Sequence, residues 1–239
     1  MKATERLKLA VFQALLWLGH NARYEMRRAM LTAARDGDLA RLARETGIRQ
    51  ETLERQRDTG LDNPAYRFER DQGLLSYLVA HAAELKGCSW LDVGADTGAV
   101  SVYLSEILQS TNFALCDVTV AARTNFPVRK IDGKRLDYER DSFDLVLFSY
   151  VLHHAGENTI SLLRDAHRIA RRHVIVAEDP NVTETDYRWA YQDDRRGTFR
   201  GLKEWRDLFA LLDFALVHDE PLDCRGHSRH FFLLAPNKA

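Results

Sequence analysis

Apolar positions follow two different periodicities along the chain, and the change between them divides it into two parts. Up to about residue 66, apolar residues recur at helical spacing, as at Leu9, Phe12 and Leu16. After one further helix, expected over about 68–85, short apolar runs alternate with helical segments. The pattern predicts an N-terminal helical extension over 1–66 and a larger domain over 67–239 that mixes helices with strands.

The larger domain contains several short apolar runs of strand length. The first five are separated by segments that can hold crossovers, as parallel strands require. The last two follow a helix expected at 202–212 and are close enough to pair as an antiparallel ribbon. The predicted strands span 89–93, 113–116, 127–131, 143–148, 173–177, 214–218 and 229–234. The expected fold is α/β: a mostly parallel seven-stranded sheet, covered by helices on both faces, with an antiparallel C-terminal strand.

Length and charge narrow the classes of function. The 239 residues suffice for one α/β core with a small extension. The 34 basic and 35 acidic side chains nearly balance, so no net field draws the chain to nucleic acid or to an anionic membrane. We therefore expect no nucleic-acid partner, and a small neutral or mixed-charge substrate.

The cysteines and the N-terminus indicate a cytosolic protein. Cys88, Cys116 and Cys224 lie far apart, and none belongs to a metal-type Cys-x-x-Cys pair, so we expect reduced thiols and no metal. The apolar stretch at 9–18 is too short to span a membrane and is followed by charged residues rather than by a cleavage site. We predict no targeting signal, no membrane span and a cytoplasmic location.

The turn after the first predicted strand, 91–98, reads Leu-Asp-Val-Gly-Ala-Asp-Thr-Gly and carries the main chemical signal. In an open α/β sheet the ligand binds beyond the carboxyl ends of the strands. Gly94 can adopt a backbone angle closed to other residues, and Gly98 lets the helix and a ligand approach closely. Free N–H groups at the helix start can then face a carboxylate or other polar ligand groups.

The spacing of this turn distinguishes between nucleotide ligands. A dinucleotide site needs Gly-x-Gly-x-x-Gly, whereas this turn has Gly-x-x-x-Gly with an acidic residue, Asp92, two positions before Gly94. A carboxylate there favours a ligand with a positive amino group, such as S-adenosylmethionine. Glycine turns also join strands to helices in folds without a cofactor, so the turn alone leaves this alternative open.

Two further acidic residues follow predicted strands. Asp117 comes after the second strand, about twenty residues beyond the turn, where a carboxylate can accept hydrogen bonds from both ribose hydroxyls. The alternative is an ordinary Asp that caps the next helix. Asp132 and Gly133 follow the third strand, where they can meet an adenine edge; the alternative is a plain Asp-Gly turn.

These motifs, with the run Asp-Ser-Phe-Asp-Leu-Val-Leu-Phe-Ser-Tyr-Val-Leu-His-His at 141–154, resemble the class I S-adenosylmethionine-dependent methyltransferases. The resemblance covers about 74–234 and is greatest to the broad type 11 group that includes quinone-biosynthesis enzymes. It implies a Rossmann-like fold, S-adenosylmethionine as the cofactor, and methyl transfer to a small-molecule metabolite.

The resemblance also implies residue roles: the turn would hold the methionine end of the cofactor, Asp117 the ribose, Asp132 the adenine, and Ser149 with Tyr150 would lie near the sulfonium. The full cofactor-binding set is Asp92, Gly94, Ala95, Asp96, Gly98, Asp117, Val118, Asp132, Gly133, Ser149 and Tyr150. One departure is Asp96, where many relatives have glycine. It either adds a contact to the cofactor amino group or narrows the site.

The candidate catalytic residues are His153 and His154, after the fourth strand and near the expected methyl group. Histidine titrates near neutral pH and can take a proton from a hydroxyl, an amine or an activated carbon. Alternatively, the pair caps the next helix or packs on the sheet edge. Glu178 and Asp179, after the fifth strand, either contact substrate or lie in a solvated loop. The segment 187–200 lies where this superfamily often has a substrate lid.

The segment 38–56 supports a different interpretation, because it resembles a helix-turn-helix with small, turn and apolar residues at Ala43, Gly47 and Leu53. Its second helix mixes acidic with basic residues, so its attraction to DNA phosphates largely cancels. We instead expect the N-terminal helices to cover the cofactor pocket or to form a homodimer contact. Two hypotheses remain: a small-molecule methyltransferase, and a non-catalytic S-adenosylmethionine-binding or helix-turn-helix regulatory protein.

Overall fold

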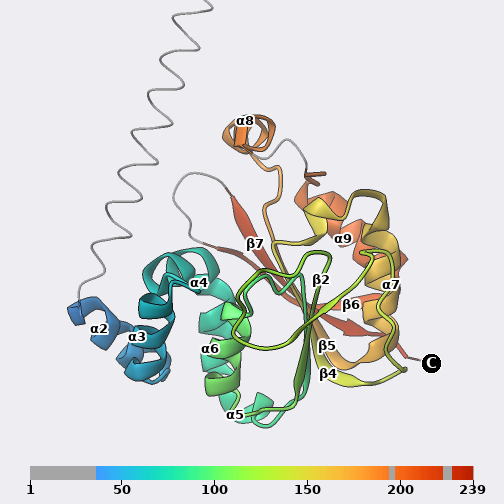
Figure 1. Cartoon of the computed structure of the whole chain (residues 1–239). Helices are drawn as coiled ribbons and strands as arrows, with labels where there is room; N and C mark the ends of the chain where they lie inside the picture. Colours follow the sequence, from blue (N-terminus) through green and yellow to red (C-terminus); the bar gives the residue numbers. More distant parts are fainter. Residues whose placement is uncertain (1–35, 194–196, 223–227, 239) are drawn as a thin grey trace, which may run out of the picture.

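The computed structural model describes residues 36–193, 197–222 and 228–238 (Figure 1). Its centre is a seven-stranded sheet with the order β3-β2-β1-β4-β5-β7-β6. The strands are β1 (Trp90–Val93), β2 (Phe113–Asp117), β3 (Val128–Lys130), β4 (Phe143–Ser149), β5 (Ala170–Glu178), β6 (Phe214–Leu222) and β7 (Arg229–Pro236). Strand β7 pairs antiparallel with β5 and β6, and the other pairs are parallel. The predicted mostly parallel sheet with an antiparallel C-terminal strand is confirmed.

Helices cover both faces of this sheet. Helices α4 and α6 lie on one face, with α2 and α3 outside them, while α7 and α9 lie on the other; α8 stands away from the body (Figure 1). The α-helices are α2 (Asp36–Thr46), α3 (Gln50–Thr59), α4 (Pro64–Ala80), α5 (Ala82–Leu85), α6 (Ala99–Ile107), α7 (Thr159–Ile169), α8 (Glu184–Asp193) and α9 (Leu202–Leu211). Two short 3-10 turns, η1 (Leu152–His154) and η2 (Gly156–Asn158), follow β4.

Alternate residues of the central strands enter two separate hydrophobic cores, because successive side chains of a strand point to opposite faces. In β4, Leu145 and Leu147 pack into the core shared with α4 and α6, whereas Val146 and Phe148 pack into the core shared with α7 and α9. Each such side chain contributes about 1.5–3 kcal/mol when fully buried. The uninterrupted apolar run in β4 therefore reflects a strand that is covered on both faces.

The connections on either side of β3 differ from the expected alternation of strands and helices. Residues 118–127 and 131–142 contain turns and bends but no helix. The first connection ends at Pro127, which cannot donate a helical hydrogen bond, and the second opens with an Asp-Gly turn. As a result, β3 is a short edge strand whose side chains remain largely accessible.

The N-terminal helices pack on the larger domain through α3. The side chain of Thr52 donates to Glu106 of α6 at 2.5 Å, and the Gln56 amide donates to Asn125 at 2.7 Å. Helix α4 begins at Pro64 and continues across the boundary expected at residue 66. The apolar stretch at 9–18 lies outside the described residues, as does most of the segment expected to form a homodimer contact. Within the described part of the chain, no helix combines the length and apolar character needed to cross a membrane.

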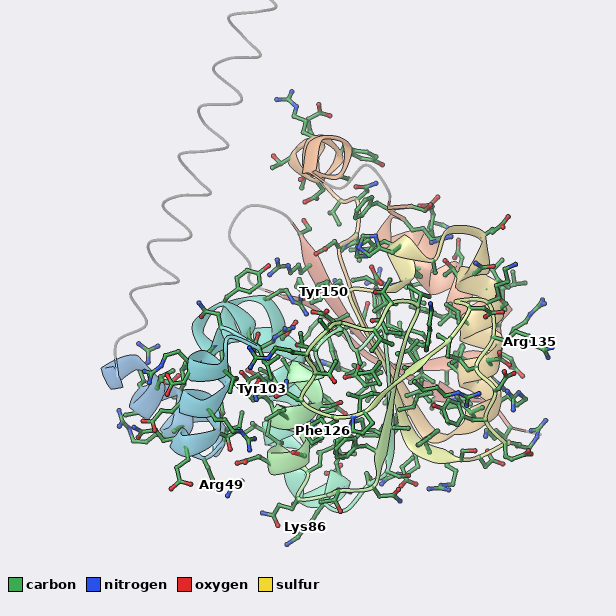
Figure 2. All side chains as sticks on the ribbon, in the orientation of Figure 1. Arg49, Lys86, Tyr103, Phe126, Arg135 and Tyr150 are labelled. Atoms are coloured by element: carbon green, nitrogen blue, oxygen red, sulfur yellow. The ribbon has the colours of Figure 1, made fainter. Side chains whose placement is uncertain are left out.

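The carboxyl ends of the parallel strands lie together at one end of the sheet. Tyr150, directly after β4, lies at this end, and Lys86, shortly before β1, lies at the opposite end (Figure 2). The strand order reverses between β1 and β4, since β2 and β3 extend to one side and β5 to the other. This reversal creates the crevice in which open α/β sheets bind ligands.

Candidate functional site

The turn after β1 contacts the segment after β4 across the reversal of strand order. Gly94 has φ +75°, and a Cβ at this position would lie 2.4 Å from Cγ2 of Val151. The N–H groups of Gly94 and Ala95 both donate to the carbonyl oxygen of Cys116, at 2.8 and 3.2 Å. Position 94 therefore needs glycine for its backbone angle and for its packing.

The second half of the turn leads into α6. Gly98 caps this helix with φ +75°, and a Cβ there would meet Cδ2 of Leu115 at 2.7 Å. The start of the helix presents N–H groups without partners in the helix, which favour negative or polar ligand groups. Asp96 has φ +50°, a conformation that costs a non-glycine residue about 1–2 kcal/mol. Asp96 thus keeps the left-handed backbone conformation that glycine adopts readily.

Asp117, at the end of β2, contacts the glycine turn directly. Its Oδ2 accepts the N–H of Asp96 at 2.9 Å, and its Oδ1 accepts the N–H of Thr119 at 2.9 Å. A carboxylate has about four acceptor sites, so these two bonds leave capacity for hydroxyl donors. No helix follows in 118–127, which removes the alternative that Asp117 caps one. That Asp117 binds the ribose stays a prediction.

The residues expected to meet adenine lie beyond Asp117. Val118 is 52% exposed, and a Cβ on Gly133 would lie 2.8 Å from its Cγ1, so the two residues adjoin. Asp132 accepts the N–H groups of Lys134 and Arg135, at 2.8 and 3.3 Å. The bond from Lys134 has the largest effect, and the two bonds together lower the pKa of the Asp132 carboxyl. Asp132 therefore builds the turn, and the exposed side chain of Val118 provides an apolar surface beside it.

The carboxyl group of Asp92 is buried and bonded to α6. Its Oδ2 accepts the hydroxyl of Ser101 at 2.8 Å, and this hydroxyl accepts the indole N–H of Trp90 at 3.1 Å. Burial raises the pKa of Asp92 to about 6, although the bond from Ser101 acts in the opposite direction. A carboxylate this buried attracts a positive amino group through its charge more than through direct contact.

The raised pKa of Asp92 predicts a pH-dependent stability. Because the folded pKa of about 6 exceeds the ordinary 3.8, the stabilisation from protonation is complete below pH 3.8 and is lost as pH rises through 6. Asp92→Asn keeps an acceptor for Ser101 and is expected to raise the free energy of unfolding at pH 8 by about 2–3 kcal/mol. Urea unfolding of both proteins at pH 5 and pH 8 measures this; a wild-type value that does not fall between these pH values contradicts it.

Ser149 is the last residue of β4 and Tyr150 follows it; the residue before them, Phe148, pairs with Val93 of β1. The Ser149 hydroxyl is buried and has no hydrogen-bond partner within the described residues. The Tyr150 hydroxyl donates to the carbonyl oxygen of Arg70 at 2.8 Å. A buried polar atom without a partner is uncommon in folded proteins, so the Ser149 hydroxyl is suited to bind a ligand group.

The two candidate catalytic histidines have different surroundings. His153 is 2% exposed, and its Nδ1 lies 2.6 Å from Oε2 of Glu178 at the end of β5. Its ring stacks on that of Phe199, with centroids 4.9 Å apart. His154 is exposed. The solvated loop considered for Glu178 is wrong, because this side chain is fully buried against His153.

The connection between α3 and α4 contacts the glycine turn. The Thr97 hydroxyl donates to the carbonyl oxygen of Leu61 at 3.1 Å, and neighbouring Asp62 accepts from Arg67 of α4 at 3.1 Å. Burial acts to lower the pKa of Arg67, but the charges of Asp71 and Asp62 outweigh it and raise that pKa. These contacts bring the α3–α4 connection onto the glycine turn; that the N-terminal helices cover the cofactor pocket stays a prediction.

Sequence reasoning missed the arginines that α4 and β7 contribute to this end of the sheet. The guanidinium groups of Arg70 and Arg229 lie 5.1 and 5.3 Å from the centre of the Tyr150 ring. Arg229 also donates to Asp179 at 3.3 Å, and both side chains are buried, so Asp179 is not in a solvated loop either. No local motif marks these residues, because α4 and β7 are far apart in the chain and meet only in the folded protein.

Comparison with known proteins agrees with this architecture. Residues 20–219 match the family model of a methyltransferase domain. Comparison with curated protein sequences finds no significant match. Among solved structures, 1,6-didemethyltoxoflavin-N1-methyltransferase from Burkholderia thailandensis has 16% identity and a TM-score of 0.54, covering 79% of this chain and 85% of that chain. Magnesium protoporphyrin IX methyltransferase from Synechocystis PCC 6803 has 15% identity and a TM-score of 0.52, covering 88% and 100%. An S-adenosylmethionine-dependent methyltransferase from Aquifex aeolicus has 15% identity and a TM-score of 0.53, covering 74% and 96%.

At these identities the solved structures establish a shared fold, whereas the family model covers most of the chain and establishes the family. The chain belongs to the methyltransferase-domain family, within the class I S-adenosylmethionine-dependent methyltransferases that its sequence motifs predict.

Proposed function

We propose that this methyltransferase transfers the methyl group of S-adenosylmethionine to a small-molecule acceptor, with the cofactor held along the carboxyl ends of β1, β2 and β4. The observation that carries the proposal is the junction between the glycine turn and Asp117. The Asp96 N–H donates to Asp117 at 2.9 Å, so the turn and the ribose-binding carboxylate form one unit.

The residues at this junction fit the parts of the cofactor. The helix start after Gly98 suits its carboxylate, and the charge of Asp92 suits its amino group. Asp117 suits the ribose hydroxyls, and the exposed face of Val118 suits the adenine ring. The buried Ser149 hydroxyl, which has no partner in the described parts of the chain, suits a polar group near the sulfonium.

The protein contributes alignment more than covalent chemistry. When bound, S-adenosylmethionine supplies an electrophilic methyl group on a sulfonium. Holding a nucleophile in line with such a group and removing water from both can lower the barrier by about 7–11 kcal/mol. The turn between Gly94 and Gly98, which packs against Val151, would fix the position of the cofactor and of its methyl group.

Two observations favour a small molecule as the acceptor. The chain carries almost no net charge, so it lacks the basic field that attracts nucleic acid. Two of the similar structures are enzymes named for small acceptors, 1,6-didemethyltoxoflavin and magnesium protoporphyrin IX, and both were solved with S-adenosylhomocysteine.

Calorimetry with S-adenosylmethionine and S-adenosylhomocysteine tests the proposal on the full chain. We expect both to bind, and we expect S-adenosylhomocysteine to form when a panel of small metabolites is added. Failure of both ligands to bind at millimolar concentration contradicts the proposal. Binding without turnover on any acceptor favours the alternative of a non-catalytic S-adenosylmethionine-binding protein.

A further inference from the structure

A buried histidine–carboxylate pair lies at the carboxyl ends of β4 and β5. The side chain of His153 is 3% exposed and that of Glu178 is fully buried, with 2.6 Å between Nδ1 and Oε2. The segment that holds His153 also contacts the glycine turn, because Val151 packs directly against Gly94. His153 therefore belongs to the segment after β4 that borders the proposed cofactor site.

Glu178 is held in place by the backbone of the segment after β4. Its Oε1 accepts the N–H groups of Val151 and Leu152, at 3.2 and 2.6 Å, which leaves Oε2 directed at His153. A carboxylate can only accept hydrogen bonds, so it places the proton of a neutral imidazole on Nδ1 and the lone pair on Nε2. The geometry thus selects the tautomer that can act as a base through Nε2.

We propose that His153 accepts a proton from the methyl acceptor through Nε2, and that Glu178 is the positioning residue that fixes its tautomer and stabilises the resulting imidazolium. This inference rests on the proposed function. The acceptor's O–H or N–H bond breaks and its proton goes to Nε2. The electron pair left on the acceptor forms the bond to the methyl carbon, and the carbon–sulfur bond breaks with its pair kept by sulfur. The imidazolium then releases the proton to solvent.

The same geometry limits the class of acceptor. A neutral imidazole takes protons most effectively from acidic groups, such as a phenol, an enol or the N–H of a heteroaromatic ring. A flat aromatic ring already lies on the imidazole, since Phe199 stacks at 4.9 Å with 22° between the planes. The Nε2 lone pair lies in the plane of the imidazole, so an acceptor has to approach it at the ring edge, beside the Phe199 ring. We therefore assign the site to small aromatic acceptors with an acidic O–H or N–H.

The isosteric change Glu178→Gln separates this role from a purely structural one. The glutamine oxygen is expected to stay with the N–H groups of Val151 and Leu152, because both are donors. Its NH2 group then faces Nδ1 and moves the imidazole proton to Nε2. The turn is retained, but the lone pair at Nε2 is lost. The matched control is Glu157→Gln, the same change on an exposed glutamate of η2.

Nitrogen NMR of the histidine side chains determines the tautomer of His153 and needs no methyl acceptor. The chain has nine histidines, and the signal missing from a His153→Gln spectrum assigns His153. We expect the Nδ1–H form in the wild type and in Glu157→Gln, and the Nε2–H form in Glu178→Gln. An Nε2–H form in the wild type, or an unchanged tautomer in Glu178→Gln, overturns the inference.

Turnover then tests the chemistry with phenols, N–H heteroaromatics and proton-free pyridines as probes. For the phenols and N–H compounds, Glu178→Gln is expected to lower kcat about 10²–10⁴-fold and to leave calorimetric binding of S-adenosylhomocysteine unchanged. Equal kcat values in Glu178→Gln and wild type, or transfer to pyridines alone, overturn the inference. Absence of cofactor binding in the wild type instead refutes the proposed function, so the two failures are distinguishable.

Discussion

Replacing Gly94 by alanine is expected to reduce the affinity for S-adenosylmethionine by at least about 100-fold and to destabilise the fold by about 2–5 kcal/mol. A positive φ costs an alanine about 1–2 kcal/mol, and overpacking costs about 1–3 kcal/mol more. The new Cβ would lie 2.4 and 2.9 Å from the two γ-carbons of Val151, so the turn has to move. Calorimetry and urea unfolding measure the two effects.

Two further variants distinguish the steric clash with Val151 from the free-energy cost of a positive φ angle at alanine. Gly87→Ala places alanine at φ +73° with no atom within 4 Å of the new Cβ, so it should lose only the backbone part and bind cofactor normally. Adding Val151→Ala to Gly94→Ala removes both clashing γ-carbons and should recover part of the binding. If Gly94→Ala behaves like Gly87→Ala, the contact with Val151 does not shape the site.

Replacing Asp117 by alanine is expected to weaken binding of S-adenosylmethionine about 100-fold with a small change in thermal stability. Each hydrogen bond to a charged group contributes about 1.5–3 kcal/mol, which corresponds to roughly 10- to 150-fold in affinity. The change also removes the acceptor that holds the Asp96 N–H at 2.9 Å, so the turn loses one of its hydrogen bonds to β2. Calorimetry with S-adenosylhomocysteine gives the same comparison without turnover.

His154→Ala is the matched control for Asp117→Ala, because His154 follows the same end of the sheet but its side chain is exposed. We expect the affinity of this variant to stay within about two-fold of the wild type. Equal losses in the two variants mean that Asp117 does not bind the ribose.

Local sequence patterns predicted the sheet and the turn well because both depend on residues close together in the chain. The apolar runs of β1, β4 and β5 correspond to central strands, and the antiparallel pair at the C-terminus formed as expected. The prediction was less successful around β3, where the connections 118–127 and 131–142 hold no helix. Short, weakly apolar segments there carry too little periodicity to separate a helix from a turn.

The candidate site was predicted as a set of positions, but not with its contacts. Asp92 and Asp117 were both predicted to bind the cofactor from their places near the ends of strands. In the structure, Asp92 is 2% exposed and bonded to Ser101, whereas Asp117 contacts the glycine turn. Successive side chains of a strand point to opposite faces of the sheet, and a sequence motif does not show which helix covers each face. A role for Glu178 could have been suspected from its place at the end of β5, but its partner His153 could not.

The amino-acid sequence by itself determined the family, the strands and the glycine turn, since these rest on periodicity and on the backbone angles that only certain residues tolerate. Only the tertiary structure decided that His153 meets Glu178 and that Arg70 approaches Tyr150 beside Arg229. Those pairs come from segments far apart in the chain. His153 meets Glu178 because β4 lies beside β5, whereas Arg70 reaches Tyr150 from α4 and Arg229 reaches it from β7. Hydrogen bonds act only over a few ångströms, so the partners could not be assigned before the arrangement of strands and helices was known.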